Sequence, residues 1–109
     1  MTIQEMRSES LPQRTDVRWF HSATVTNATS DPLILPSLER DSVAVSVTPG
    51  TSARVEYSLS SYADIEADTA TWNAWPHGDS AAAISDAVDA RVSALRLVST
   101  GASTWEVTA

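Results

Sequence analysis

The sequence contains no cysteine and no lysine, and only 3 of its 109 residues are glycine. The lack of cysteine excludes disulfide bonds, a thiolate nucleophile and cysteine-ligated metal sites. Because all 7 basic residues are arginine, a Schiff-base lysine and the phosphate-binding lysine of a P-loop are excluded as well. The sequence also lacks any apolar run long enough for a transmembrane helix, so no membrane partner is predicted.

Positive charge is scarce relative to negative charge. The chain has 14 acidic and 7 basic residues, which gives a formal net charge of -7 and argues against binding to nucleic-acid phosphates. Hydrophobic residues make up 42% of the chain, which is enough for one packed core, and the length corresponds to one domain. Residues 1–7 lack the apolar stretch of a secretory signal, so we predict no such signal here.

Alternation of apolar and polar residues predicts β-strands along most of the chain. In residues 17–26 the odd-numbered positions from Val17 to Val25 share one face, which includes Trp19 and His21. Two further pairs of alternating runs each surround a turn, and we predict that each pair is a β-hairpin. These pairs are residues 43–48 with 54–59, and residues 95–98 with 105–107. The residues predicted to point into one core are Val43, Val45, Val47, Val55 and Tyr57.

The segment 80–94 is open to two interpretations. Its apolar residues Ile84, Val88 and Val92 recur at helical spacing, whereas every neighbouring segment is predicted to be a strand. One helical turn is expected near residues 63–66 and a strand at 72–75. The 28 serine and threonine residues, set against 3 glycines, favour an antiparallel sandwich. We therefore predict an all-β protein, a small antiparallel β-sandwich of jelly-roll or Ig-like type, with residues 80–94 as strand or alternatively helix.

The predicted sandwich spans residues 17–109 and follows an N-terminal arm, residues 1–16. This arm is too polar to offset its own ordering entropy, so we expect it to lie on another surface. The favoured surface is a neighbouring subunit, and the alternative is the protein's own sandwich, to which the arm would add an edge strand. The residues predicted to contact a partner are Ile3, Met6 and Leu11 through apolar contacts, and Arg7 and Arg14 through ion pairs.

Tryptophan is abundant for so short a chain, with 4 residues. Trp19 and Trp105 lie on alternating strands and are expected in the core. Trp72 and Trp75 are three apart and face opposite sides of a strand, and Trp75, next to a proline, is the one predicted to contact a partner.

Ion pairs between exposed side chains are predicted on two strands. Arg54 and Glu56 face the same side, and Arg96 could pair with Glu106 across the last hairpin. Both are expected to be surface pairs that add little stability.

Histidines do not form a recognisable catalytic motif here. His21 is expected to be a packed, hydrogen-bonded histidine and not a ligand or a base. His77 could pair with Asp79, but no G-x-S-x-G motif supplies a nucleophile. We therefore predict that the protein is not an enzyme and that neither histidine is catalytic.

One acidic stretch has part of a calcium-loop pattern. Residues 64–68 place carboxylates at the first, third and fifth positions, but Thr69 and Trp75 stand where an EF-hand needs glycine and glutamate. We therefore predict no metal site, and we expect no cofactor.

Four segments resemble small structural proteins of tailed-bacteriophage virions, of the capsid cement, decoration or head-fibre type. They are VAVSVTPGTSARVEYS (43–58), ATWNAWPHG (70–78), VSALR (92–96) and ASTWEV (102–107). The resemblance covers roughly residues 40–109. It implies a non-enzymatic protein that decorates or cements the capsid through subunit contacts.

The partners implied by this resemblance are the major capsid protein, other copies of the chain in a homo-oligomer, or both. The implied location is the capsid surface of the virion, after synthesis in the host cytoplasm. The alternatives are a phage fibre or tail-associated module, and a carbohydrate-binding β-sandwich that uses Trp72 or Trp75.

Overall fold

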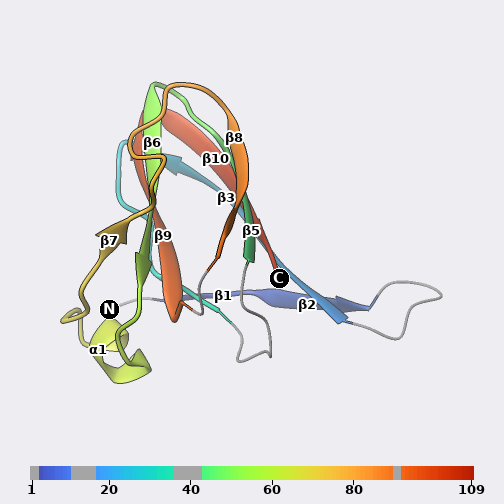
Figure 1. Cartoon of the computed structure of the whole chain (residues 1–109), viewed down its shortest axis with the longest axis vertical. Coiled ribbons are helices and arrows are strands. Elements are labelled where there is room, and N and C mark those ends of the chain that lie inside the picture. The colour runs from blue at the N-terminus through green and yellow to red at the C-terminus, as the bar shows by residue number, and fades with distance from the viewer. Residues whose placement is uncertain (1–2, 11–16, 36–42, 90–91) are drawn as a thin grey trace.

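The computed structural model describes residues 3–10, 17–35, 43–89 and 92–109, and it contains two β-sheets of five strands each (Figure 1). Sheet A consists, in spatial order, of β1 (Gln4–Glu5), β4 (Leu33–Ile34), β9 (Ala94–Thr100), β6 (Ser52–Ser58) and β7 (Asn73–Ala74). Sheet B consists of β2 (Arg7–Ser10), β3 (Val17–Thr26), β10 (Ala102–Thr108), β5 (Val43–Thr48) and β8 (Ile84–Val88). Helix α1 (Tyr62–Glu66) lies between β6 and β7 in the sequence.

The strand order defines the type of sandwich. If β3 is counted as strand 1 and β10 as strand 8, sheet B has the order 1-8-3-6 and sheet A has the order 2-7-4-5. The two N-terminal strands are additional: β2 lies at one edge of sheet B and β1 at one edge of sheet A. This order, with the chain passing repeatedly from one sheet to the other, is that of a jelly roll. The predicted all-β sandwich is thus confirmed, and of the two types considered, the topology is that of the jelly roll. All strand pairs are antiparallel except β1 with β4, which are parallel.

The core lies between the two sheets and follows the predicted alternation. Burial alternates residue by residue in β5 and β10, as expected for strands with one covered face. Trp105 is fully buried at the centre, and Trp19 packs against the same cluster, as predicted. The four predicted core valines are buried, and Tyr57 is half-buried against them; the valines are Val43, Val45, Val47 and Val55.

Neither predicted hairpin forms. Strand β5 lies in sheet B and β6 in sheet A, and β9 and β10 are separated in the same way. The turn at Gly50 and the turn at Gly101 are therefore corners between sheets. These corners bind each other: the Thr51 N–H donates to the Thr100 carbonyl at 2.9 Å, and the Gly50 N–H donates to Ser103 Oγ at 3.0 Å. Alternation specifies which face of a strand is buried, but the pairing partner of the strand is left open.

The ambiguous segment 80–94 contains a strand. β8 pairs with β5, with Val88 opposite Val43 and Ile84 opposite Val47. Ile84 and Val88 are four residues apart, and this spacing places two side chains on the same face both in a strand and in a helix. The expected turn near residues 63–66 is α1, and Ser61 caps it by accepting the Asp64 N–H at 3.2 Å.

Candidate partner-binding site

The N-terminal segment belongs to the sandwich from residue 4 onward. Gln4 pairs with Leu33 in sheet A, and four residues later the same segment continues in sheet B, where Ser8 pairs with Trp19. The division into an arm of residues 1–16 and a sandwich of 17–109 is therefore corrected, because residues 4–10 supply an edge strand to each sheet. Folding back on the protein's own domain, the alternative considered above, is what these residues do. Backbone hydrogen bonds provide the ordering that their polar side chains cannot.

The predicted contact residues of this segment have different environments. Met6 lies between β1 and β2, where the segment crosses from one sheet to the other, and its side chain is only 6% exposed within the core. Met6 therefore binds its own domain, which corrects its assignment to a partner. Ile3 is half-buried, whereas Arg7 is exposed and has no ion pair among the described residues. Leu11 and Arg14 lie outside the described residues.

The prediction that Trp75 contacts a partner is also corrected, because Trp75 is 6% exposed and belongs to the core. The Trp75 N–H donates to the Val55 carbonyl at 2.9 Å, which fixes the chain beside β6 and turns the indole inward. The ring of His77 packs edge-on against Trp75, with 4.4 Å between ring centroids. The partly exposed member of the tryptophan pair is Trp72.

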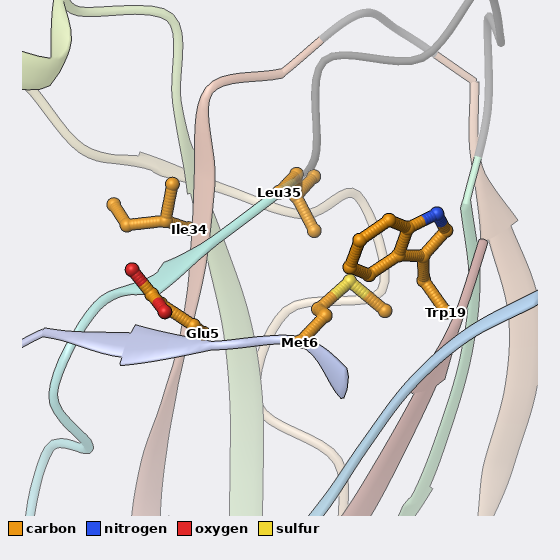
Figure 2. A pocket seen from close by; sticks show the side chains of 5 residues that line it. All are labelled: Glu5, Met6, Trp19, Ile34 and Leu35. Carbon is orange, nitrogen blue, oxygen red and sulfur yellow. The ribbon is translucent and has the colours of Figure 1, made fainter. Parts of the chain in front are cut away.

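A pocket of about 210 Å³ lies where the N-terminal segment crosses between the sheets. Figure 2 shows Glu5 and Ile34 at one end of this pocket, Met6 and Trp19 at the other, and Leu35 between them. The volume is below the roughly 300 Å³ at which small-molecule sites begin. Its lining is apolar apart from one carboxylate and contains no nucleophile with a neighbouring base. The pocket therefore suits a single side chain of a partner better than a substrate.

Next to this pocket, β2 and the beginning of β3 form a ribbon, here called the β2–β3 ribbon. Strand β3 pairs with β2 at residues 17–20 and with β10 at residues 20–26, so the two pairings overlap only at the middle of the strand. The ribbon consequently extends past the end of β10, and Figure 1 shows it leaving the body of the sandwich at the lower right. Because β2 is the last strand of sheet B, its outer edge has no partner strand among the described residues.

A cluster of charges occupies the outer face of sheet A. Glu56 is 8% exposed and accepts bonds from Arg54 Nε at 2.9 Å and from Arg96 Nη2 at 2.6 Å. Arg54 also contacts Asp79 at 3.2 Å, and the guanidinium of Arg96 lies 4.3 Å above the ring of Trp72. Burial alone would raise the pKa of Glu56, but the hydrogen bonds from the two arginines outweigh it and lower the pKa below its usual value.

This cluster corrects two expectations. Arg96 pairs with Glu56, its register neighbour on β6, and not with Glu106, because β9 and β10 lie in different sheets. The Arg54–Glu56 pair, predicted to lie at the surface, involves a buried carboxylate.

Glu56→Gln is expected to destabilise the fold by about 1–2 kcal/mol, because both arginines lose a charged partner that is mostly shielded from water. Since the pKa of Glu56 is lowered in the fold, its contribution is present above the unfolded value of 4.5 and is lost as the pH falls through the folded value. Urea unfolding at pH 7 measures the loss. The exposed Glu106→Gln is the control and should change stability by less than about 0.5 kcal/mol; equal losses in the two variants would contradict the role of Glu56.

The two histidines have separate surroundings. His77 Nε2 lies 2.8 Å from Asp86 Oδ2, so its carboxylate partner is Asp86 and not the predicted Asp79, which binds Arg54. His21 is half-buried and packs edge-on against Trp105, with 5.7 Å between ring centroids, so the predicted packing is confirmed. The expected hydrogen bond is missing at one of its nitrogens, because the buried Nε2 has no partner among the described residues.

His21 makes stability depend on pH. Burial lowers the pKa of His21 from 6.5, so the unfolded chain binds a proton at this residue more readily than the folded chain does. The free energy of unfolding therefore has its full value above pH 6.5, and it falls as the pH decreases through 6.5 toward the pKa of His21 in the folded protein. His21→Phe keeps a ring against Trp105 and should remove this part of the pH dependence. Urea unfolding of both proteins at pH 8 and pH 6 tests this, and an equal loss in both would show that His21 is not the cause.

No family model matches the chain, and no curated protein or solved structure is significantly similar to it. In the described part of the chain, no group of three or more metal-ligating side chains converges, and Asp64 of the acidic stretch hydrogen-bonds Ser61 and Thr69 instead. The helix within the same residues is too short to cross a membrane.

Proposed function

We propose that this chain is a non-enzymatic structural protein of a tailed-bacteriophage particle, which decorates or cements the capsid through subunit contacts. The observation that carries the proposal is the β2–β3 ribbon, which extends from the sandwich and whose outer edge no described strand pairs with. Such edges are templates for pairing with another chain, and proteins normally cover them. The sequence resemblance over residues 40–109 supports the same function, and jelly rolls are common among viral shell proteins.

The contact area of one ribbon is small, so one copy would attach weakly. A shell presents its binding sites in many copies, and repeated weak contacts give firm attachment when several are engaged together. The proposed partners are the major capsid protein, other copies of this chain, or both. The net charge of -7 keeps an abundant protein soluble before it reaches the shell.

Electron cryo-microscopy of particles from the phage that encodes the chain tests this proposal. The expected result is density for the jelly roll at repeated positions on the capsid surface, with the β2–β3 ribbon facing the shell. Density at the tail or in a fibre would favour the tail-associated alternative. Particles that contain none of this protein would overturn both.

A carbohydrate-binding role is the second candidate, and one observation favours it. Trp72 is half-buried on the outer face of sheet A, held against Arg96 near polar side chains, and exposed tryptophans stack on sugar rings. Titration with host cell-surface oligosaccharides, followed by tryptophan fluorescence, should then give a saturable change that Trp72→Ala abolishes. No change with the unmodified protein would remove this candidate.

A further inference from the structure

The direction of the backbone groups in the β2–β3 ribbon follows from one pair of hydrogen bonds. The Trp19 N–H donates to the Ala109 carbonyl and the Ala109 N–H donates to the Trp19 carbonyl, both at 3.0 Å. Both polar backbone groups of Trp19 therefore point toward β10 and away from β2. Since successive residues of a strand alternate in direction, those of Arg18 and Phe20 point toward β2.

The same alternation fixes which groups of β2 are free. Arg7 and Glu9 stand opposite Phe20 and Arg18 and exchange hydrogen bonds with them. Ser8 stands opposite Trp19, and Ser10 opposite Val17, in the positions that make no bonds across the ribbon. The N–H and C=O groups of Ser8 and Ser10 therefore point outward along the free edge of sheet B, and no strand covers them in the described part of the chain.

We propose that an extended segment of the capsid partner adds to this edge as a further strand and hydrogen-bonds the backbone of Ser8 and Ser10. This inference rests on the proposed function and specifies how the contact is made. Strand addition to an exposed sheet edge is a general mode of peptide recognition, in which backbone bonds supply affinity. The ribbon extends past the end of β10, and Figure 1 shows it projecting from the body of the sandwich.

A second copy of the chain fits this edge poorly. Two β2 strands related by a twofold axis could pair Ser8 with Ser10 of the other copy, but this register sets Glu9 opposite Glu9. Like charges directly opposite each other destabilise a strand pair. Pairing Ser8 with Ser8 avoids this conflict but leaves only one residue of each copy to exchange bonds. A different chain has neither restriction.

Arg7 indicates the chemistry of the partner segment. Its side chain is exposed and has no ion pair among the described residues, although the protein carries twice as many acidic as basic residues. A strand bound at Ser8 places one of its residues directly beside Arg7. We expect an acidic residue there, since opposite charges on neighbouring strands attract.

Two substitutions at one position test the proposal. Ser8→Pro removes the outward N–H, which no strand in the described part of the chain bonds, so the fold should remain stable. Ser8→Ala removes only the hydroxyl and is the matched control. Binding to particles lacking this protein is measured by co-sedimentation; Ser8→Pro should weaken it about tenfold or more, and Ser8→Ala should bind like the unmodified protein.

Circular dichroism first checks that both variants fold. If Ser8→Pro does not, amide hydrogen exchange of the unmodified protein replaces it, and binding should slow exchange at Ser8 and Ser10 at least tenfold. Equal binding by all three proteins, or unchanged exchange at these amides in the bound state, would overturn the inference and leave the proposed function intact. If the unmodified protein does not bind the particles at all, the proposed function fails and the inference fails with it.

Discussion

Replacing Val45 by aspartate is expected to unfold the protein at neutral pH. Val45 is 1% exposed, and it lies in β5, an inner strand of sheet B, with Val107 of β10 on one side and β8 on the other. An unpaired carboxylate at this position costs several kcal/mol, whether it stays charged or takes up a proton. Since a domain of this size has a total stability of about 5–15 kcal/mol, most of the folded population should be lost.

Ala44→Asp is the matched control for this variant. Ala44 is the preceding residue of β5, and its side chain is exposed on the opposite face. The same new charge there should change stability by about 0.5 kcal/mol or less. Circular dichroism and urea unfolding compare the two. If Val45→Asp folds with the stability of Ala44→Asp, the buried face of β5 has been assigned wrongly.

The correct prediction of this buried face shows what a local pattern can establish. Val43, Val45 and Val47 alternate with smaller or polar residues, and a strand with one covered side is the structure that uses this pattern. The same reasoning placed Trp19 and Trp105 in the core. Each of these inferences needs only the residue and its neighbours along the chain.

The errors concern which segments meet in space. The turns at Gly50 and Gly101 have the composition of hairpin turns, and nothing local distinguishes such a turn from a corner between sheets. The Arg96–Glu106 pair depended on one of these hairpins, so its failure followed from the first error. The actual partner of Arg96, Glu56, is set by the pairing of β6 with β9, which are 40 residues apart at this point.

The candidate site was predicted in part. The polarity of the N-terminal segment correctly indicated that it needs another surface, but the composition could not distinguish the protein's own sandwich from a partner. The structure divides the segment: Met6 fills the core, whereas no described strand covers the outward backbone groups of Ser8 and Ser10. Which backbone groups lie along the outer edge depends on the hydrogen-bond register of β2 with β3. A pattern of side chains does not predict this register, so sequence reasoning missed both serines.

Gly101→Ala is expected to destabilise the protein by about 2–5 kcal/mol. Gly101 has a φ of 78°, a region that costs other residues about 1–2 kcal/mol. An added Cβ would also lie 2.7 Å from the backbone nitrogen of Thr51 in the neighbouring corner, and relieving such an overlap costs a further 1–3 kcal/mol or so. The shift would strain the bond from the Gly101 N–H to Asn27 Oδ1, now 2.7 Å long.

Gly78→Ala separates the two contributions to this loss. Gly78 has a similar φ of 60°, but a Cβ there would meet nothing within 4 Å, so its substitution costs only the backbone term. The difference between the two variants in urea unfolding therefore measures how tightly the two corners pack together. We expect Gly101→Ala to cost at least about 1 kcal/mol more than Gly78→Ala. In isolated hairpins the turns at Gly50 and Gly101 would not touch, so Gly101→Ala and Gly78→Ala would lose the same stability. Equal losses would therefore contradict the jelly-roll corners and favour the hairpins that the sequence pattern predicted.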